Sequence, residues 1–413
     1  MSDVIRHDLR CGAPVFFESI SGVRSVGLTW LLPAGSATDP EHLEGISALW
    51  WELIQRGAGD RDSRQHADAL DRIGVSRSVS AGTRYLRIQA TMPGDRLADA
   101  LPLLADMVLG PRMDADAIEP TRDLALQALE SLRDDPQERA VLAARARHRP
   151  SPFNRSGLGT EKGLRAIDRD ALVDGWRERA RPIGSVIGLA GDLDAQPIRD
   201  RLDELLGRWS GRYDLPEVSG RPPRGYAHET DDSNQVQIVV AQDGPEEDSD
   251  DAVLERVISS VLAGGMSGRL FTEVREKRGL CYAVHSSYYT DRDRGVVSSY
   301  VGTTPERAQE SLDVLWSELG RVGQHNGQVT PDEFDRAIVG MKSRLVFSGE
   351  STLARSAALT SDFVKLGRVR TLDDVTAEID AVTLERVNEY AQRRKTGTPT
   401  IQTLGPDRLT PPA

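Results

Sequence analysis

The order of predicted elements repeats around a stretch in the middle of the 413-residue chain. Residues 213–225 contain three prolines and show no hydrophobic periodicity, which is typical of a linker. On each side of this stretch, the pattern predicts strands, a pair of helices, a hairpin, long helices and a closing strand. The sequence therefore predicts two similar halves, residues 1–212 and residues 226–413, joined by the linker 213–225.

Each half contains a hairpin with helices before and after it. In the first half the predicted strands are Val75–Ser80 and Arg84–Met92, and in the second half they are Cys281–Thr290 and Gly295–Thr303. Hairpins produce antiparallel pairing, and helices inserted between such strands pack on one side of the sheet. The sequence therefore predicts the α+β class, with a mainly antiparallel sheet and packed helices in each half.

One helix is predicted with particular clarity, over Gly45–Arg56. Its apolar residues recur with a period of 3.6, at Ile46, Leu49, Trp50, Leu53 and Ile54. The opposite face is predicted to carry Ala48, Trp51, Glu52 and Gln55. A later helix is predicted over Pro120–Arg133, with its proline in the first turn.

Composition excludes several function classes. The formal charge of −12 argues against binding to a phosphate backbone, which requires clustered lysine and arginine. No apolar run is long enough to cross a membrane, and the N-terminal residues show no signal peptide, so we expect a cytoplasmic protein with Cys11 and Cys281 as free thiols. The seven histidines are widely spaced, and no two of them can lie on adjacent turns of one helix.

Two segments carry a resemblance to a known family. They are GISALWWELIQRG at Gly45–Gly57 and GGMSGRLFTEVREKRGLCYAV at Gly264–Val284. With Ala190-Gly191-Asp192 and the two-half layout, they resemble the pitrilysin/insulinase family of zinc peptidases. That family includes mitochondrial processing peptidase and the core proteins of the cytochrome bc complex. The resemblance covers nearly the whole chain and implies two homologous α/β-roll halves with the metallohydrolase fold of the processing peptidase.

Active members of that family carry His-x-x-Glu-His on the first of these segments. In this chain the matching positions hold Ala48, Trp51 and Glu52. The family's third ligand, a glutamate, falls near Ala128, and Glu130 lies about 200° away around the helix. Alanine cannot bind a metal, indole offers only an N–H donor, and one carboxylate is fewer than the three protein ligands of a catalytic zinc. We therefore expect no metal or cofactor in this chain and zinc in a partner subunit.

Trp51 has two interpretations that the sequence leaves open. It could fill the space of the metal and its water, or offer an apolar wall to a peptide. It could equally pack at an interface with the other half or with a partner, since aromatic residues are common in interfaces.

The second segment keeps residues that the resemblance assigns to the substrate. Arg275 is predicted in the last turn of a helix, Gly279 at the turn, and Tyr282 at the start of the next strand. From spacing alone, an ion-paired arginine and a strand-core tyrosine are the simpler interpretation. In the family, an arginine and a tyrosine at this separation bind substrate and help to hold the scissile carbonyl, so the resemblance favours substrate binding.

Two further features of this segment are less specific. The family's glycine-rich loop implies that Gly264 and Gly265 contact substrate, whereas the sequence alone favours a flexible turn between helices with Ser267 as the N-cap. Cys281 could be considered a nucleophile, but no basic partner is evident beyond His285, and both residues are predicted to alternate onto the face opposite Tyr282. A buried free thiol is therefore the prediction for Cys281.

These observations predict a non-catalytic subunit of a heteromeric zinc metallopeptidase. Its partner would be a homologous zinc-bearing subunit, and its substrate an unfolded peptide, with no nucleic acid or membrane involved. The alternative is a homodimeric scaffold or peptide-binding protein of the same fold without a peptidase role.

Overall fold

The computed structural model describes residues 4–412, and the chain within it forms two units that exchange segments. Unit 1 is built from the residues up to Ser131, Ser151–Gly220 and Ser348–Thr371. Unit 2 is built from Leu132–Pro150, Arg221–Phe347 and the residues from Leu372 onward. Neither unit is therefore one uninterrupted stretch of the chain.

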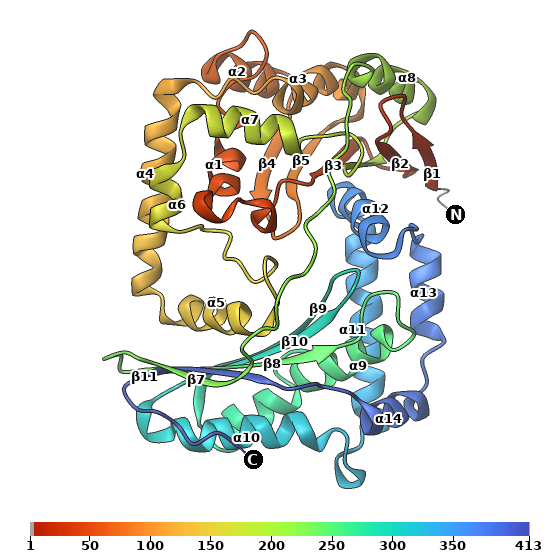
Figure 1. Ribbon diagram of the computed structural model, residues 1–413. Coiled ribbons are helices and arrows are strands. Elements are labelled where there is room, and N and C mark those ends of the chain that lie inside the picture. The colour runs from red at the N-terminus through yellow and green to blue at the C-terminus, as the bar shows by residue number, and fades with distance from the viewer. Residues whose placement is uncertain (1–3, 413) are drawn as a thin grey trace. The chain divides into compact units, whose positions relative to one another are not determined.

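Unit 1 contains a six-stranded sheet with the order β1-β2-β6-β3-β5-β4 (Figure 1). The pairing of β2 with β6 is parallel, and every other neighbouring pair is antiparallel. Both faces of β6 are buried, which explains why its sequence is apolar throughout rather than alternating. The strands are β1 Val4–Asp8, β2 Pro14–Ser19, β3 Ser25–Leu32, β4 Ser76–Ala81, β5 Leu86–Pro93 and β6 Val186–Gly191.

Eight α-helices belong to unit 1 within the described residues. A single core joins the sheet to these helices, with Phe17, Trp30 and Trp50 among its largest buried side chains. The buried Trp50 indole donates to the carbonyl of Leu172 at 3.0 Å, so its polar atom is satisfied. The helices are α1 Ile46–Leu53, α2 Ser63–Arg72, α3 Leu97–Leu109, α4 Ala115–Ser131, α6 Glu161–Ala166, α7 Arg169–Arg179, α8 Ala195–Leu206 and α12 Thr352–Leu366.

Unit 2 contains a five-stranded sheet with the order β7-β11-β8-β10-β9. Its strands are β7 Gly225–Thr230, β8 Val236–Gly244, β9 Cys281–Thr290, β10 Gly295–Thr303 and β11 Thr400–Gly405. Only β7 and β11 pair in parallel, as only β2 and β6 do in unit 1. The five strands of unit 2 thus repeat the order β2-β6-β3-β5-β4, which confirms the predicted α+β class with two homologous halves.

The helices of unit 2 surround a second core. This core includes side chains of β8, α9 and α10 together with Tyr390. The helices are α5 Pro136–His148, α9 Ala252–Ala263, α10 Ala308–Arg321, α11 Pro331–Gly349, α13 Leu372–Asp380 and α14 Leu384–Arg393. Across residues 4–412, no helix combines the length and apolarity that a membrane crossing needs.

Two helices pack in the unit opposite to their place in the sequence. The late helix α12, drawn in blue, lies against β3 and β6 of unit 1 (Figure 1). Glycines make this approach possible, because a Cβ on Gly27 would lie 2.5 Å from the backbone of Thr352 and Leu353. The early helix α5 lies against β8 and β11 of unit 2, where it buries Ala140 and Ala144.

Several predicted elements are confirmed and others are wrong. The hairpin strands Cys281–Thr290 and Gly295–Thr303 have the predicted bounds. The helix predicted to begin at Pro120 begins at Ala115, so its proline lies in the second turn rather than the first. Helix α5 is absent from the prediction because a proline usually marks the end of a helix, whereas Pro136 opens a new one behind the N-cap Asp135.

Candidate functional site

The helix that resembles the family's metal-binding helix is anchored at its N-terminus by Asp39. The Asp39 carboxylate accepts hydrogen bonds from the backbone N–H of Gly45 at 2.8 Å and from the Ser47 hydroxyl at 3.1 Å. Gly45 has φ of +115°, a conformation that glycine adopts without strain. Burial raises the pKa of Asp39 to about 6, although its hydrogen bonds and Arg155 act in the opposite direction.

The side chains of α1 that are expected to match the family's metal ligands do not fit zinc. Ala48 is only 7% exposed, so it is buried although it lies on the helix face opposite the apolar stripe. Trp51 is 37% exposed and offers no lone pair to a metal. The Glu52 carboxylate is engaged by Arg56, one turn later, at 2.7 Å. This helix therefore supplies one carboxylate, and that carboxylate already has a cationic partner.

The later helix α4 does not complete a metal site either. It packs against α1, but Ala128 has no metal-binding atom, and Glu130 is exposed on α4. Among residues 4–412, no three side chains of histidine, cysteine, aspartate or glutamate come together as a metal would require. The described residues of α1 and α4 thus do not match the donor set of a catalytic zinc.

Arg275 lies in a helical turn of π type, Phe271–Glu276, which leads towards β9. Its guanidinium lies 5.0 Å from the centre of the Phe271 ring, and the side chain is exposed. Gly279 has φ of +59°, and its N–H donates to the Arg275 carbonyl at 3.0 Å. Gly279 therefore makes the turn that was predicted for it, and the chain returns directly into the strand that begins at Cys281.

Tyr282 occupies a β-bulge at the start of β9. Ala283 pairs with Gly302 and Cys281 pairs with Thr303, so Tyr282 is the extra residue on its strand. Its side chain is 68% exposed, and within residues 4–412 it makes no hydrogen bond. A bulge changes the direction in which a side chain points, which explains why this tyrosine faces solvent rather than the core.

The bulge also corrects the predicted face of Cys281. Cys281 is 8% exposed and packs in the same core that Val284, three residues later, also contacts. On a regular strand, residues three apart would lie on opposite faces, so the bulge accounts for their common side. Burial raises the pKa of the Cys281 thiol to about 11, against the opposing effect of Arg275. The thiol is therefore protonated at neutral pH and is a poor nucleophile. The ring of His285 stacks instead on Tyr300, with centres 4.8 Å apart.

The glycines of the loop between α9 and Phe271 are required by its backbone. A Cβ on Gly264 would collide with the Ser260 carbonyl, and Gly265 has φ of +131°. Met266, which follows these two glycines in the same loop, is highly exposed. Backbone conformation thus accounts for Gly264 and Gly265, and their contact with substrate remains a prediction.

Sequence reasoning missed two contributors to these sites, Asp39 and the bulge. Asp39 stands immediately before a proline and a few residues before the helix, a pattern that signals a turn but not a buried carboxylate. The bulge depends on the register between β9 and β10, which no local pattern reveals.

Two family models match the chain. Residues 15–156 match "Insulinase (Peptidase family M16)", and residues 166–341 match "Peptidase M16 inactive domain". The uncharacterized zinc protease YmxG of Bacillus subtilis is 26% identical over 394 residues, which cover 94% of this chain and 95% of that protein. An uncharacterized zinc protease of Streptomyces coelicolor is 25% identical over 426 residues, covering 98% of this chain and 90% of the relative.

Solved structures show the same fold. A peptidase M16 inactive domain from Pseudomonas fluorescens matches with a TM-score of 0.86 and 22% identity, covering 99% of each chain. A chain of Complex III2 from Candida albicans matches with a TM-score of 0.82 and 16% identity, covering 98% of this chain and 96% of the other. Because adjacent models of one family account for most of its length, the chain belongs to peptidase family M16.

Proposed function

We propose that this chain is the non-catalytic subunit of a two-chain zinc metallopeptidase. The observation that carries the proposal is a contrast between two sites of the chain. The helix α1 offers no donor set for zinc, because Ala48 is buried and the Glu52 carboxylate is bound to Arg56. By contrast, Arg275 and Tyr282 are both exposed near one tight turn. This contrast fits two homologous subunits that divide the reaction between them. The partner would hold the zinc, and this chain would hold donors for the substrate.

The chemistry of this pair suits a peptide carbonyl. The Arg275 guanidinium keeps its charge, and the Tyr282 hydroxyl is a directed donor that no protein acceptor occupies within residues 4–412. Donors of this kind stabilise a carbonyl oxygen that gains negative charge during attack. In the proposed complex, the zinc-bearing partner supplies the metal and the general base, while this chain binds an unfolded peptide through Arg275 and Tyr282.

The test is peptide hydrolysis by the reconstituted pair of subunits. Tyr282→Phe removes one donor and should lower kcat by about 100-fold, the usual effect of losing one donor to a developing oxyanion. Arg275→Ala should lower kcat/KM at least as much, since it removes a charged donor. The matched control is Tyr289→Phe, because Tyr289 is also exposed and lies on the same strand. Full hydrolysis by a pair that carries both substitutions would exclude this role.

A scaffold without a peptidase role is the second candidate. The similarity to a chain of Complex III2 favours it, because the fold there is part of a large assembly. Isolation of the chain from its native source distinguishes the two functions. A heterodimer with a subunit that carries His-x-x-Glu-His supports the peptidase subunit, whereas a stable homodimer without such a subunit supports the scaffold.

A further inference from the structure

The exposed Arg275 guanidinium rests on an aromatic ring instead of a carboxylate. Within residues 4–412, its side chain forms no hydrogen bond and no ion pair. It lies over the half-buried Phe271 ring, 5.0 Å from the ring centre. A cation within about 6 Å of a ring centre is attracted by the negative face of the ring. The charge of Arg275 also opposes the rise in the pKa of the Cys281 thiol, so the guanidinium lies near the start of β9.

The carboxylate two residues before Arg275 is engaged by other cations. Glu273 accepts from the Lys277 ammonium and from the Arg278 guanidinium, each at 2.7 Å. These hydrogen bonds hold the pKa of Glu273 below its ordinary value. The segment thus pairs two of its cations with Glu273 and leaves the charge of Arg275 open to a ligand.

The backbone brings the ring and the guanidinium together. Phe271 and Arg275 belong to the π turn Phe271–Glu276, which a hydrogen bond from the Lys277 N–H to the Thr272 carbonyl closes at 2.9 Å. Side chains four residues apart lie on the same side of a helical turn. Turns of π type are rare and frequently occur at functional sites.

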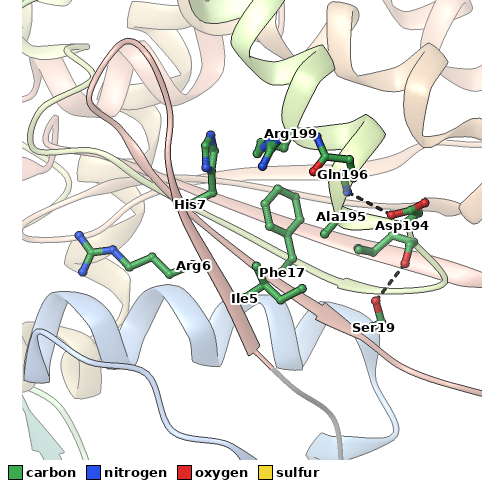
Figure 2. A pocket seen from close by; sticks show the side chains of 10 residues that line it. Ile5, Arg6, His7, Phe17, Ser19, Asp194, Ala195, Gln196 and Arg199 are labelled. Atoms are coloured by element: carbon green, nitrogen blue, oxygen red, sulfur yellow. Dashed lines mark hydrogen bonds between the residues drawn. The ribbon is translucent and has the colours of Figure 1, made fainter.

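A second contact between an arginine and a phenylalanine has a different charge balance. A cavity of about 450 Å³ lies beside β1 in unit 1 and is lined in part by Arg6 (Figure 2). Arg6 lies over the Phe363 ring at 5.3 Å, yet it also pairs with Asp8 at 3.0 Å. Stacking on a ring does not by itself leave an arginine unpaired, so the open charge of Arg275 is a feature of its own site.

We propose that Phe271 is a positioning residue for Arg275. Its ring holds the guanidinium near the start of β9 without neutralising the charge that is to meet a peptide carbonyl. This inference rests on the proposed function, because that function supplies the peptide as the ligand of Arg275. Phe271 acts through Arg275 and not by contact with the peptide.

A double-mutant cycle tests this role in peptide hydrolysis by the reconstituted pair of subunits. Phe271→Leu keeps an apolar side chain without the aromatic face and should lower kcat/KM about two- to fivefold, the range for one exposed cation–π contact. Phe271→Tyr keeps the face and should retain the wild-type value. In the Arg275→Ala background, Phe271→Leu should have no further effect. Equal losses in both backgrounds would overturn the proposal, because the ring would then act on the fold and not on Arg275.

The matched control is Phe363→Leu. It removes the ring beneath Arg6, a contact of the same kind that involves none of the residues assigned to substrate. It should leave kcat/KM unchanged, and a loss as large as that of Phe271→Leu would contradict a specific role for Phe271.

A nuclear magnetic resonance measurement on the isolated chain does not depend on hydrolysis. The Nε–H signal of Arg275 is identified by its loss in Arg275→Lys. It should lie upfield of its position in Phe271→Leu, because an aromatic ring shields a group held over its face. An identical position in both proteins would overturn the positioning role. A shifted signal with full hydrolysis by Arg275→Ala would instead place the error in the proposed function.

Discussion

At the scale of single residues, the most consequential side chain outside the predicted sites is Asp39. It is buried and accepts from Gly45 and Ser47 at the start of α1, and burial raises its pKa from 3.8 to about 6. A carboxyl whose pKa is higher in the folded state stabilises the fold below its unfolded pKa. That contribution is lost as the pH rises through about 6.

This pKa shift predicts a specific pH dependence of stability. Between pH 4 and pH 7.5, the wild type should lose about 2.4 kcal/mol of unfolding free energy relative to Asp39→Asn, which cannot titrate. Urea denaturation at a series of pH values measures the difference. Parallel curves for the two proteins over this range would show that the pKa of Asp39 is not raised.

At the scale of elements, α12 is held to the unit 1 sheet by buried polar contacts as well as by packing. The Arg355 guanidinium Nε lies 2.9 Å from the Glu18 carboxylate, and both side chains are buried. Thr29 and Ser356 form a hydrogen bond at 2.9 Å beside them. A buried pair contributes little net stability when formed, but removal of one member leaves the other charge buried without its ion-pair partner.

This contact predicts non-additive effects of substitution. Arg355→Met alone should lower the free energy of unfolding by about 3–5 kcal/mol, because it leaves the Glu18 charge buried. The double variant Glu18→Gln with Arg355→Met should recover most of that loss. Urea denaturation of the four proteins in the cycle gives the coupling, and additive losses would mean that the two charges do not interact.

Elements with a strong local pattern could be predicted, and others could not. The strands β9 and β10 follow from two runs rich in valine and tyrosine on either side of the charged turn at residues 291–294. Helix α5 is rich in arginine and alanine and has no apolar stripe of its own, so its burial in unit 2 depends on partners distant in sequence. Its Arg139, for example, pairs with Glu229 and Asp231, about 90 residues later in the chain.

At the scale of the whole molecule, the exchange of α5 and α12 couples the folding of the two halves. Without α12, the outer face of the unit 1 sheet would expose Phe16, Leu31 and Val186, which now form a small buried cluster with Leu359. The halves of the sequence are therefore not the units that bury a core.

This coupling predicts the behaviour of fragments. A fragment of residues 1–220 expressed alone should aggregate or expose apolar surface to a dye, since its sheet lacks the cover of α12. Co-expression with residues 221–413 should restore a soluble complex that elutes as one species. A monomeric, cooperatively unfolding 1–220 fragment would contradict the prediction.

The sequence by itself determined the α+β class, the repeat of one plan in two halves and the degenerate metal positions on α1. The first two features depend on periodicity and residue type, which are local properties of the chain, and the third is implied by the resemblance of Gly45–Gly57 to the family's metal-binding segment. Tertiary structure alone decided that Ala48 is buried, that a bulge turns Tyr282 to solvent, that α5 and α12 exchange units, and that a cavity lies beside β1. Each of these depends on register or packing between segments far apart in sequence, and no local pattern contains that information.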